Sequence, residues 1–143
     1  MPEILLAEDN SADVYLIREA LKAHGVQSTV RLASDGEDVL RIVSPQDPTS
    51  ADPDPDLGLI ILDLNLPRHD GIEILERLRE NAKLAHVPVV VLTSSDSPRD
   101  RLIATSLGAA RYLRKPSSLD QFLSLGAVFK ELLEQSGSKA EGV

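Results

Sequence analysis

Three carboxylates directly follow apolar segments of this sequence, and they are its best candidates for chemistry. Glu8 and Asp9 come after the first apolar segment, and Asp63 ends a later run that is apolar throughout. If they converge, two carboxylates about 5 Å apart repel each other by roughly 3 kcal/mol at an effective dielectric constant of about 20, so the group needs cations. Lys115 would offset one charge, and a hard divalent cation with oxygen ligands would offset the rest. These residue types predict a site for Mg²⁺ and a phosphoryl group.

Buried parallel strands would bring these side chains to one edge of a sheet. Segments that are apolar on both faces are typical of central strands covered by helices, and open α/β sheets bind ligands beyond the carboxyl ends of their strands. Three such segments end at polar residues: 4–7 before Glu8, 58–62 before Asp63, and 87–92 before Thr93. We therefore expect these polar side chains to meet at one edge.

Strands and helices alternate five times along the chain. The apolar patterns predict strands at 4–7, 28–33, 58–62, 87–92 and 110–113. Each is followed by a helix whose start is marked by a polar residue, namely Asn10 or Ser11, Asp35, Asp70, Ser97, and Ser117 or Ser118. Five such units predict an α/β fold of the flavodoxin-like, doubly wound type, with a five-stranded parallel sheet of order 2-1-3-4-5 and helices on both faces. We expect one domain over 1–135 and a flexible tail over 136–143.

Two segments have features of partner contacts. The stretch 44–56 holds four prolines and four aspartates, which predicts an exposed loop; a solvated insertion is the favoured interpretation and a partner-specific contact the alternative. The last helix is apolar over more of its circumference than the stripe of about 100° that a surface helix normally shows. This surplus favours self-association or partner docking, and the alternative is a helix that lies deeper in the core. The apolar positions are Leu119, Phe122, Leu123, Leu125, Val128, Phe129, Leu132 and Leu133.

The composition excludes several classes of protein. With 15 basic and 23 acidic residues the net charge is −8, which disfavours binding to nucleic acid and to anionic membranes. No apolar run approaches the roughly 20 residues of a membrane span, and no signal peptide is recognisable. The lack of cysteine excludes disulfides and thiolate sites. We expect a cytoplasmic protein without nucleic-acid or membrane partners.

The polar residues at the strand ends form an ordered set of motifs. They are Glu8-Asp9-Asn10, the stretch 63–71, Thr93, and Lys115-Pro116. Together and in this order they resemble the receiver domain of two-component response regulators, over nearly the whole chain. The sequences of 63–68 and of 10–13, together with the long loop after the second helix, are most similar to the small stand-alone bacterial regulators associated with phytochrome histidine kinases.

The resemblance implies how phosphate would be handled. Asp63 would be the phosphoacceptor, Lys115 would pair with the phosphoryl oxygens, and Thr93 would hydrogen-bond one of them. Thr93 and Tyr112 would form the switch, the tyrosine changing rotamer on phosphorylation. The Lys115–Pro116 bond would be cis and would place the ammonium in the pocket.

The resemblance also implies the metal ligands. Asp9 and Asp63, with the backbone carbonyl of Asn65, would bind Mg²⁺ directly, and Glu8 would act mainly through a metal-bound water. Mg²⁺ commonly takes one or two carboxylates together with waters and a phosphate, which agrees with this set.

The function implied is that of a stand-alone phosphorelay receiver. It would accept a phosphoryl group from a histidine kinase of the phytochrome type, lose it by hydrolysis, and catalyse nothing beyond these two steps. Without an output domain it would signal by protein contact, as a homodimer through the fourth helix, fifth strand and fifth helix. Two alternatives are a constitutive binding module that is not phosphorylated, and a phosphate sink that drains a kinase.

Overall fold

The computed structural model describes residues 2–43, 56–95 and 97–141, with the side chains of 137–141 excepted. Most of the predicted loop 44–56 therefore lies outside the described residues. The elements in chain order are β1 (Glu3–Ala7), α1 (Ser11–Ala23), β2 (Val30–Ala33), α2 (Gly36–Val43), β3 (Leu57–Leu62), α3 (Gly71–Glu80), the short 3₁₀ helix η1 (Ala82–Leu84), β4 (Val89–Thr93), α4 (Pro98–Ser106), β5 (Arg111–Arg114) and α5 (Leu119–Glu141).

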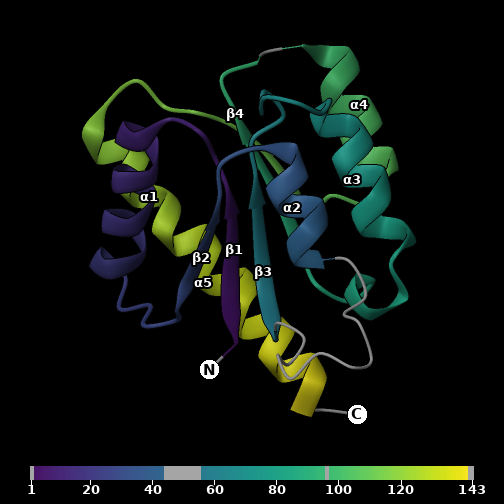
Figure 1. The fold of residues 1–143 in the computed structure, drawn as a ribbon. Coiled ribbons are helices and arrows are strands. Elements are labelled where there is room, and N and C mark those ends of the chain that lie inside the picture. Colours follow the sequence, from purple (N-terminus) through teal and green to yellow (C-terminus); the bar gives the residue numbers. More distant parts are fainter. Residues whose placement is uncertain (1, 44–55, 96, 142–143) are drawn as a thin grey trace.

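The sheet has the predicted architecture. Its five strands are all parallel and lie in the order β2-β1-β3-β4-β5. The labels of Figure 1 show β2, β1, β3 and β4 in this order. Every residue of β3 and β4 is buried, which explains why these segments are apolar on both faces. The doubly wound order 2-1-3-4-5 is thus confirmed.

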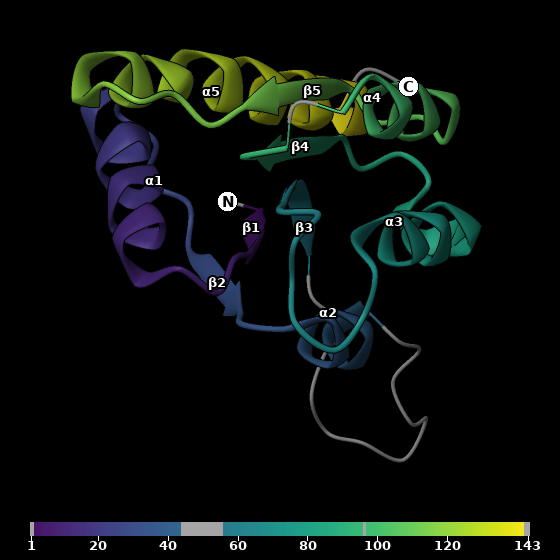
Figure 2. The same cartoon turned by 90° about the horizontal axis from the view of Figure 1, so that it is seen from above.

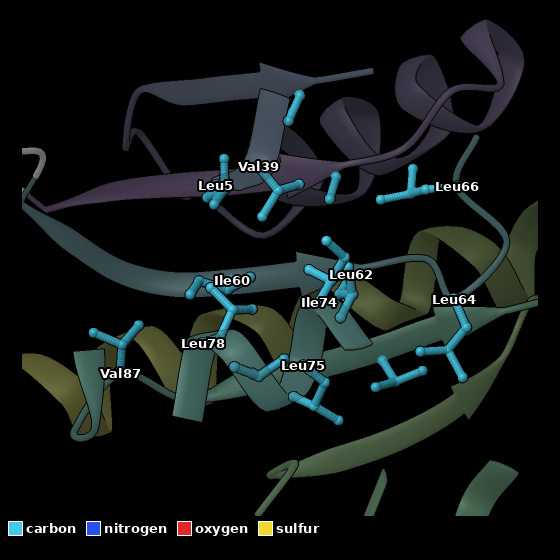
Figure 3. Close-up of a cluster of buried hydrophobic side chains, with 14 of the residues drawn as sticks. Leu5, Val39, Ile60, Leu62, Leu64, Leu66, Ile74, Leu75, Leu78 and Val87 are labelled. Atoms are coloured by element: carbon cyan, nitrogen blue, oxygen red, sulfur yellow. The ribbon is translucent and has the colours of Figure 1, made fainter. Parts of the chain in front are cut away.

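Helices cover both faces of the sheet, as predicted. Figure 2 shows α1 and α5 on one side and α2, α3 and α4 on the other. Strand residues alternate between the two cores: Leu5 contributes to the core under α2 and α3, whereas Ile4 contributes to the core under α1 and α5. Figure 3 shows the first core, in which Leu62 of β3 lies close to Ile74 of α3.

Most of the predicted helix starts are confirmed by capping contacts. The side chain of Asn10 accepts a hydrogen bond from the backbone N–H of Asp13 at 3.0 Å and begins α1. Ser97 caps α4 ahead of Pro98, and Ser118 accepts from the N–H of Gln121 at 3.2 Å at the start of α5. The strand limits differ from the prediction by one or two residues, so that β5 ends at Arg114.

The last helix differs from the prediction in two ways. It continues to Glu141 rather than ending near residue 135, so most of the predicted tail 136–143 is helical. Much of its apolar surface packs within the chain, because Phe122, Phe129, Leu132 and Leu133 are buried against the sheet and α1. The deeper-burial interpretation is therefore correct for these positions, whereas Leu119 is 59% exposed. Among the described helices, none combines the length and apolar character that crossing a membrane requires.

Candidate functional site

Backbone pairing beyond the strand ends positions the predicted site residues. The N–H of Glu8 bonds to Ala33 O at 3.0 Å, and the N–H of Asp63 bonds to Ala7 O at 3.0 Å. In the same way the N–H of Lys115 bonds to Thr93 O at 2.8 Å. Each site residue thus continues a strand ladder by one step, which leaves little freedom to its main chain.

The predicted acidic cluster is formed. Glu8, Asp9 and Asp63 each offer a carboxylate oxygen, and these oxygens all lie within 4.8 Å of one another. Glu8 and Asp63 are 2% and 4% exposed, while Asp9 is exposed to solvent. Two of the three charges are therefore removed from bulk water, which increases their mutual repulsion.

Lys115 neutralises part of this charge through three short contacts. Its Nζ lies 2.9 Å from Glu8 Oε2, 2.9 Å from Asp63 Oδ2 and 2.7 Å from Asp13 Oδ2. An ammonium has three N–H donors, so these contacts use all of them. Asp13 was not among the predicted site residues, although its place in the first turn of α1, four residues after Asp9, offered a signal.

The environment shifts the pKa values of two of these groups. Burial raises the pKa of Glu8 from 4.5 to about 7, although the hydrogen bond from Lys115 acts in the opposite direction. Burial lowers the pKa of the Lys115 ammonium, but the bonds to Asp13, Glu8 and Asp63 outweigh it, and its pKa lies above the ordinary value. The lysine is therefore charged throughout the physiological range.

Asn65 and Thr93 complete the surroundings of Asp63. The N–H of Asn65 donates to Asp63 Oδ1 at 2.9 Å, and the Asn65 side-chain amide donates to Thr93 Oγ1 at 3.1 Å. Thr93 is fully buried, and its Oγ1 also accepts from the N–H of Ser95 at 3.3 Å. Asp63, Asn65 and Thr93 are thus brought together as predicted, while the metal-binding role of the Asn65 carbonyl stays a prediction.

The loop between β3 and α3 is held tightly in place. The N–H of Gly71 bonds to Leu64 O at 3.2 Å, and a side chain at Gly71 would collide with the Leu64 backbone. The N–H of Gly36, at the start of α2, bonds to Pro67 O at 3.1 Å. Arg68, with a φ of 77°, pairs with Glu37 at 3.1 Å. The hydrogen bond from Gly36 and the ion pair with Glu37 therefore attach the loop that carries Asn65 to α2.

The predicted cis bond between Lys115 and Pro116 is wrong. No peptide bond between described residues is cis, and both residues belong to the part that the structure describes. The long side chain of Lys115 reaches all three carboxylates from a trans peptide.

Tyr112 of β5 is buried in the core that also holds Leu62 and Ile74. It is 9% exposed, and its hydroxyl is buried without a hydrogen-bond partner among the described residues. The guanidinium carbon of Arg101, from α4, lies 4.9 Å from the centre of its ring, a cation–π contact. A buried hydroxyl without a hydrogen-bond partner costs free energy of desolvation, so this orientation of the side chain is not strongly favoured over another. Its switch role stays a prediction.

The donor set fits a divalent cation. The cluster supplies only oxygen atoms, the ligand type that hard cations such as Mg²⁺, Mn²⁺ and Ca²⁺ prefer. Lys115 contacts one oxygen each of Glu8 and Asp63, which leaves a net negative charge on the group.

Sequence comparisons place the chain among known proteins. The family model described as the response regulator receiver domain matches residues 4–125. Response regulator Rcp1 of Synechocystis sp. is 35% identical over 122 residues, which are 85% of this chain and 82% of Rcp1. Response regulator MprA of Mycobacterium ulcerans is 32% identical over 121 residues, which are 85% of this chain but 47% of MprA. The chain thus spans about half the length of that relative.

Solved structures give the same result. The phosphorylated cyanobacterial phytochrome response regulator RcpA superposes with a TM-score of 0.80 at 32% identity, covering 92% of this chain and 93% of RcpA. The Mn²⁺-bound form of Rcp1 superposes with a TM-score of 0.77 at 32% identity, covering 91% and 93% of the two chains. Similarity in both sequence and fold extends over almost the entire chain.

Proposed function

The chain belongs to the response regulator receiver family, and we propose that it accepts a phosphoryl group on Asp63 from the phosphohistidine of a histidine kinase. The observation that carries this proposal is the contact of 2.9 Å between Lys115 Nζ and Asp63 Oδ2 inside a buried acidic cluster. A nucleophilic carboxylate beside a fixed ammonium suits phosphoryl transfer, because the transferred charge requires positioned cations more than covalent assistance.

The transfer exchanges one bond to phosphorus for another. An oxygen of Asp63 attacks the phosphorus, the bond from phosphorus to the histidine nitrogen breaks, and that nitrogen keeps the electron pair. Hydrolysis later adds a water oxygen to the phosphorus and returns Asp63 as a carboxylate with release of inorganic phosphate. The chain catalyses these two steps on itself and has no other substrate.

Lys115, Thr93 and Asn65 would orient the phosphoryl group. The Lys115 ammonium already bonds to Asp63 and is placed to meet the negative oxygens of the phosphoryl group. The Thr93 hydroxyl accepts from the Asn65 amide and can turn its own hydrogen toward a phosphoryl oxygen. Mutual positioning of this kind is the main contribution of a protein to phosphoryl transfer.

Mg²⁺ would be held by Asp9, Asp63 and the Asn65 carbonyl, with Glu8 acting through a water. When bound, it would supply positive charge to the phosphoryl oxygens. Asp9 lies at the exposed side of the cluster, whereas Glu8 and Asp63 are buried, so water screens their interaction with a cation only weakly.

A phosphorylation assay tests the proposal. The protein is incubated with acetyl phosphate and Mg²⁺, and its intact mass is measured. We expect one added phosphoryl group in the wild type and none in Asp63→Asn, whereas Asp56→Asn, an exposed aspartate near the opposite end of β3, should behave as wild type. Absence of an adduct with acetyl phosphate and with a cognate kinase would favour a constitutive binding module instead.

A phosphate sink is the second alternative to a signalling role. A signalling receiver binds a target with different affinities in its two states, whereas a sink does not. Pull-down with and without beryllofluoride, a phosphoryl mimic, therefore separates them. A target retained in only one state supports signalling, and its absence from both supports a sink.

The proposal extends to the partners and the location of the protein. Similarity to phytochrome response regulators such as RcpA supports a phytochrome-type histidine kinase as the phosphoryl donor. The net charge of −8 disfavours nucleic acid and anionic membrane surfaces as partners, and we propose a cytoplasmic location. We further propose signalling as a homodimer through α4, β5 and α5.

A further inference from the structure

Asp13 makes the shortest of the three contacts to Lys115. Its Oδ2 lies 2.7 Å from Nζ, against 2.9 Å for the oxygens of Glu8 and Asp63. The pair is largely shielded from solvent, since the side chains of Lys115 and Asp13 are 13% and 21% exposed. Charge-assisted bonds of this length are strong, and shielding from water strengthens them further.

Asp13 differs from the other two partners because it lies outside the candidate metal cluster. That cluster consists of Glu8, Asp9 and Asp63. A cation that binds there competes with the ammonium for Glu8 and Asp63, and a phosphoryl group on Asp63 changes the charge of that carboxylate as well. Asp13 is then the one partner of Lys115, among those the structure describes, that neither event engages.

The turn between β1 and α1 holds Asp13 in a defined position. The N–H of Asp13 donates to Asn10 Oδ1 at 3.0 Å, and the N–H of Asn10 donates to Glu8 Oε1 at 3.1 Å. Asn10 therefore links two of the carboxylates that contact Lys115. This arrangement keeps the separation between Asp13 and the cluster nearly constant.

We infer that Asp13 is a positioning residue that retains the Lys115 ammonium at the site while Glu8 and Asp63 take up metal and phosphoryl group. The inference rests on the proposed function. The inference predicts that, without the Asp13 carboxylate, the Lys115 ammonium competes more strongly with the metal for Glu8 and Asp63. The ammonium is then also less well placed for the incoming phosphoryl oxygens.

The test is a double-mutant cycle with Asp13→Asn, Lys115→Ala and the combined variant. The rate of phosphorylation by acetyl phosphate at saturating Mg²⁺ should fall about tenfold in Asp13→Asn, the size of effect expected for a lost charged hydrogen bond. Asp13→Glu should recover part of the rate. Asp120→Asn, which removes the same charge from the first turn of α5, should behave as wild type. In the Lys115→Ala background, Asp13→Asn should have no further effect.

Mg²⁺ affinity, measured by calorimetry on the same variants, provides a readout that does not require phosphoryl transfer. Asp13→Asn should weaken Mg²⁺ binding several-fold more when Lys115 is present than in the Lys115→Ala background. If the wild type is phosphorylated but Asp13→Asn matches Asp120→Asn, or if its effect is the same with and without Lys115, the inference is overturned. If the wild type is not phosphorylated, the proposed function fails, and the coupling in Mg²⁺ affinity alone decides whether the pair positions the ammonium.

Discussion

Burial of Glu8 determines how the site responds to protons. Its carboxylate is 2% exposed, bonds to Lys115 and accepts from the N–H of Asn10. Even so, burial raises its pKa from 4.5 to about 7, and repulsion from the nearby Asp63 charge adds a smaller contribution in the same direction. Metal binding requires the charged form, so protons and cations compete for this residue near neutral pH.

We expect the metal-free protein to lose stability as pH rises from about 4.5 to about 7. In this window the unfolded chain has released the Glu8 proton while the folded protein still binds it, so folding becomes less favourable with increasing pH. Urea unfolding of the wild type and of Glu8→Gln measures this directly. The stability of the wild type relative to Glu8→Gln should decline across the window, and saturating Mg²⁺ should remove the decline. A difference that is independent of pH would contradict the raised pKa.

At the scale of elements, α5 packs against α1 close to the segment that carries Lys115. Gly126 lies where α5 approaches α1, and a Cβ there would collide with the backbone carbonyl of Ala20. Phe122 and Phe129, which lie on either side of Gly126 along α5, are buried in the core that α5 shares with α1 and the sheet. The start of α5 in turn follows closely after Lys115.

We expect Gly126→Ala to destabilise the protein by about 1–3 kcal/mol. The added methyl group overpacks a backbone contact, and this cost exceeds the gain of up to about 1 kcal/mol from replacing glycine in a helix. Ala127→Ser, at the exposed neighbouring position, should change stability by less than about 0.5 kcal/mol. Chemical denaturation measures both. Equal stability of Gly126→Ala and wild type would show that the two helices can separate without cost.

At the scale of the whole molecule, the charge distribution bears on assembly. The net charge of −8 opposes association of copies, unless unlike charges meet locally. The edge strand β5 exposes Arg111 and Arg114, while α5 exposes Glu131 and Glu134. A two-fold contact through this face would set the arginines of one protomer against the acids of its partner.

We expect the beryllofluoride-bound protein to be a homodimer that is sensitive to salt and to charge reversal at this face. Arg111→Glu should weaken the dimer about tenfold, since like charges would then meet across the contact. Arg18→Glu makes the same charge change on exposed α1 and should have little effect. Analytical ultracentrifugation measures the dissociation constants. A wild-type monomer at high concentration, with and without beryllofluoride, would rule out the proposed homodimer.

The sequence by itself determined the order of the elements and the edge at which Glu8, Asp63 and Thr93 meet. These features depend on local rules, because a strand that is buried on both faces is apolar throughout and a helix start requires a capping side chain. Tertiary structure decided what depends on distant segments. The contact of Asp13 with Lys115 joins positions 102 residues apart, and the burial of Phe129 depends on how closely α5 approaches α1. The trans bond before Pro116 also belongs to the tertiary structure, because an X-Pro bond can adopt either isomer and its surroundings in the folded chain select one.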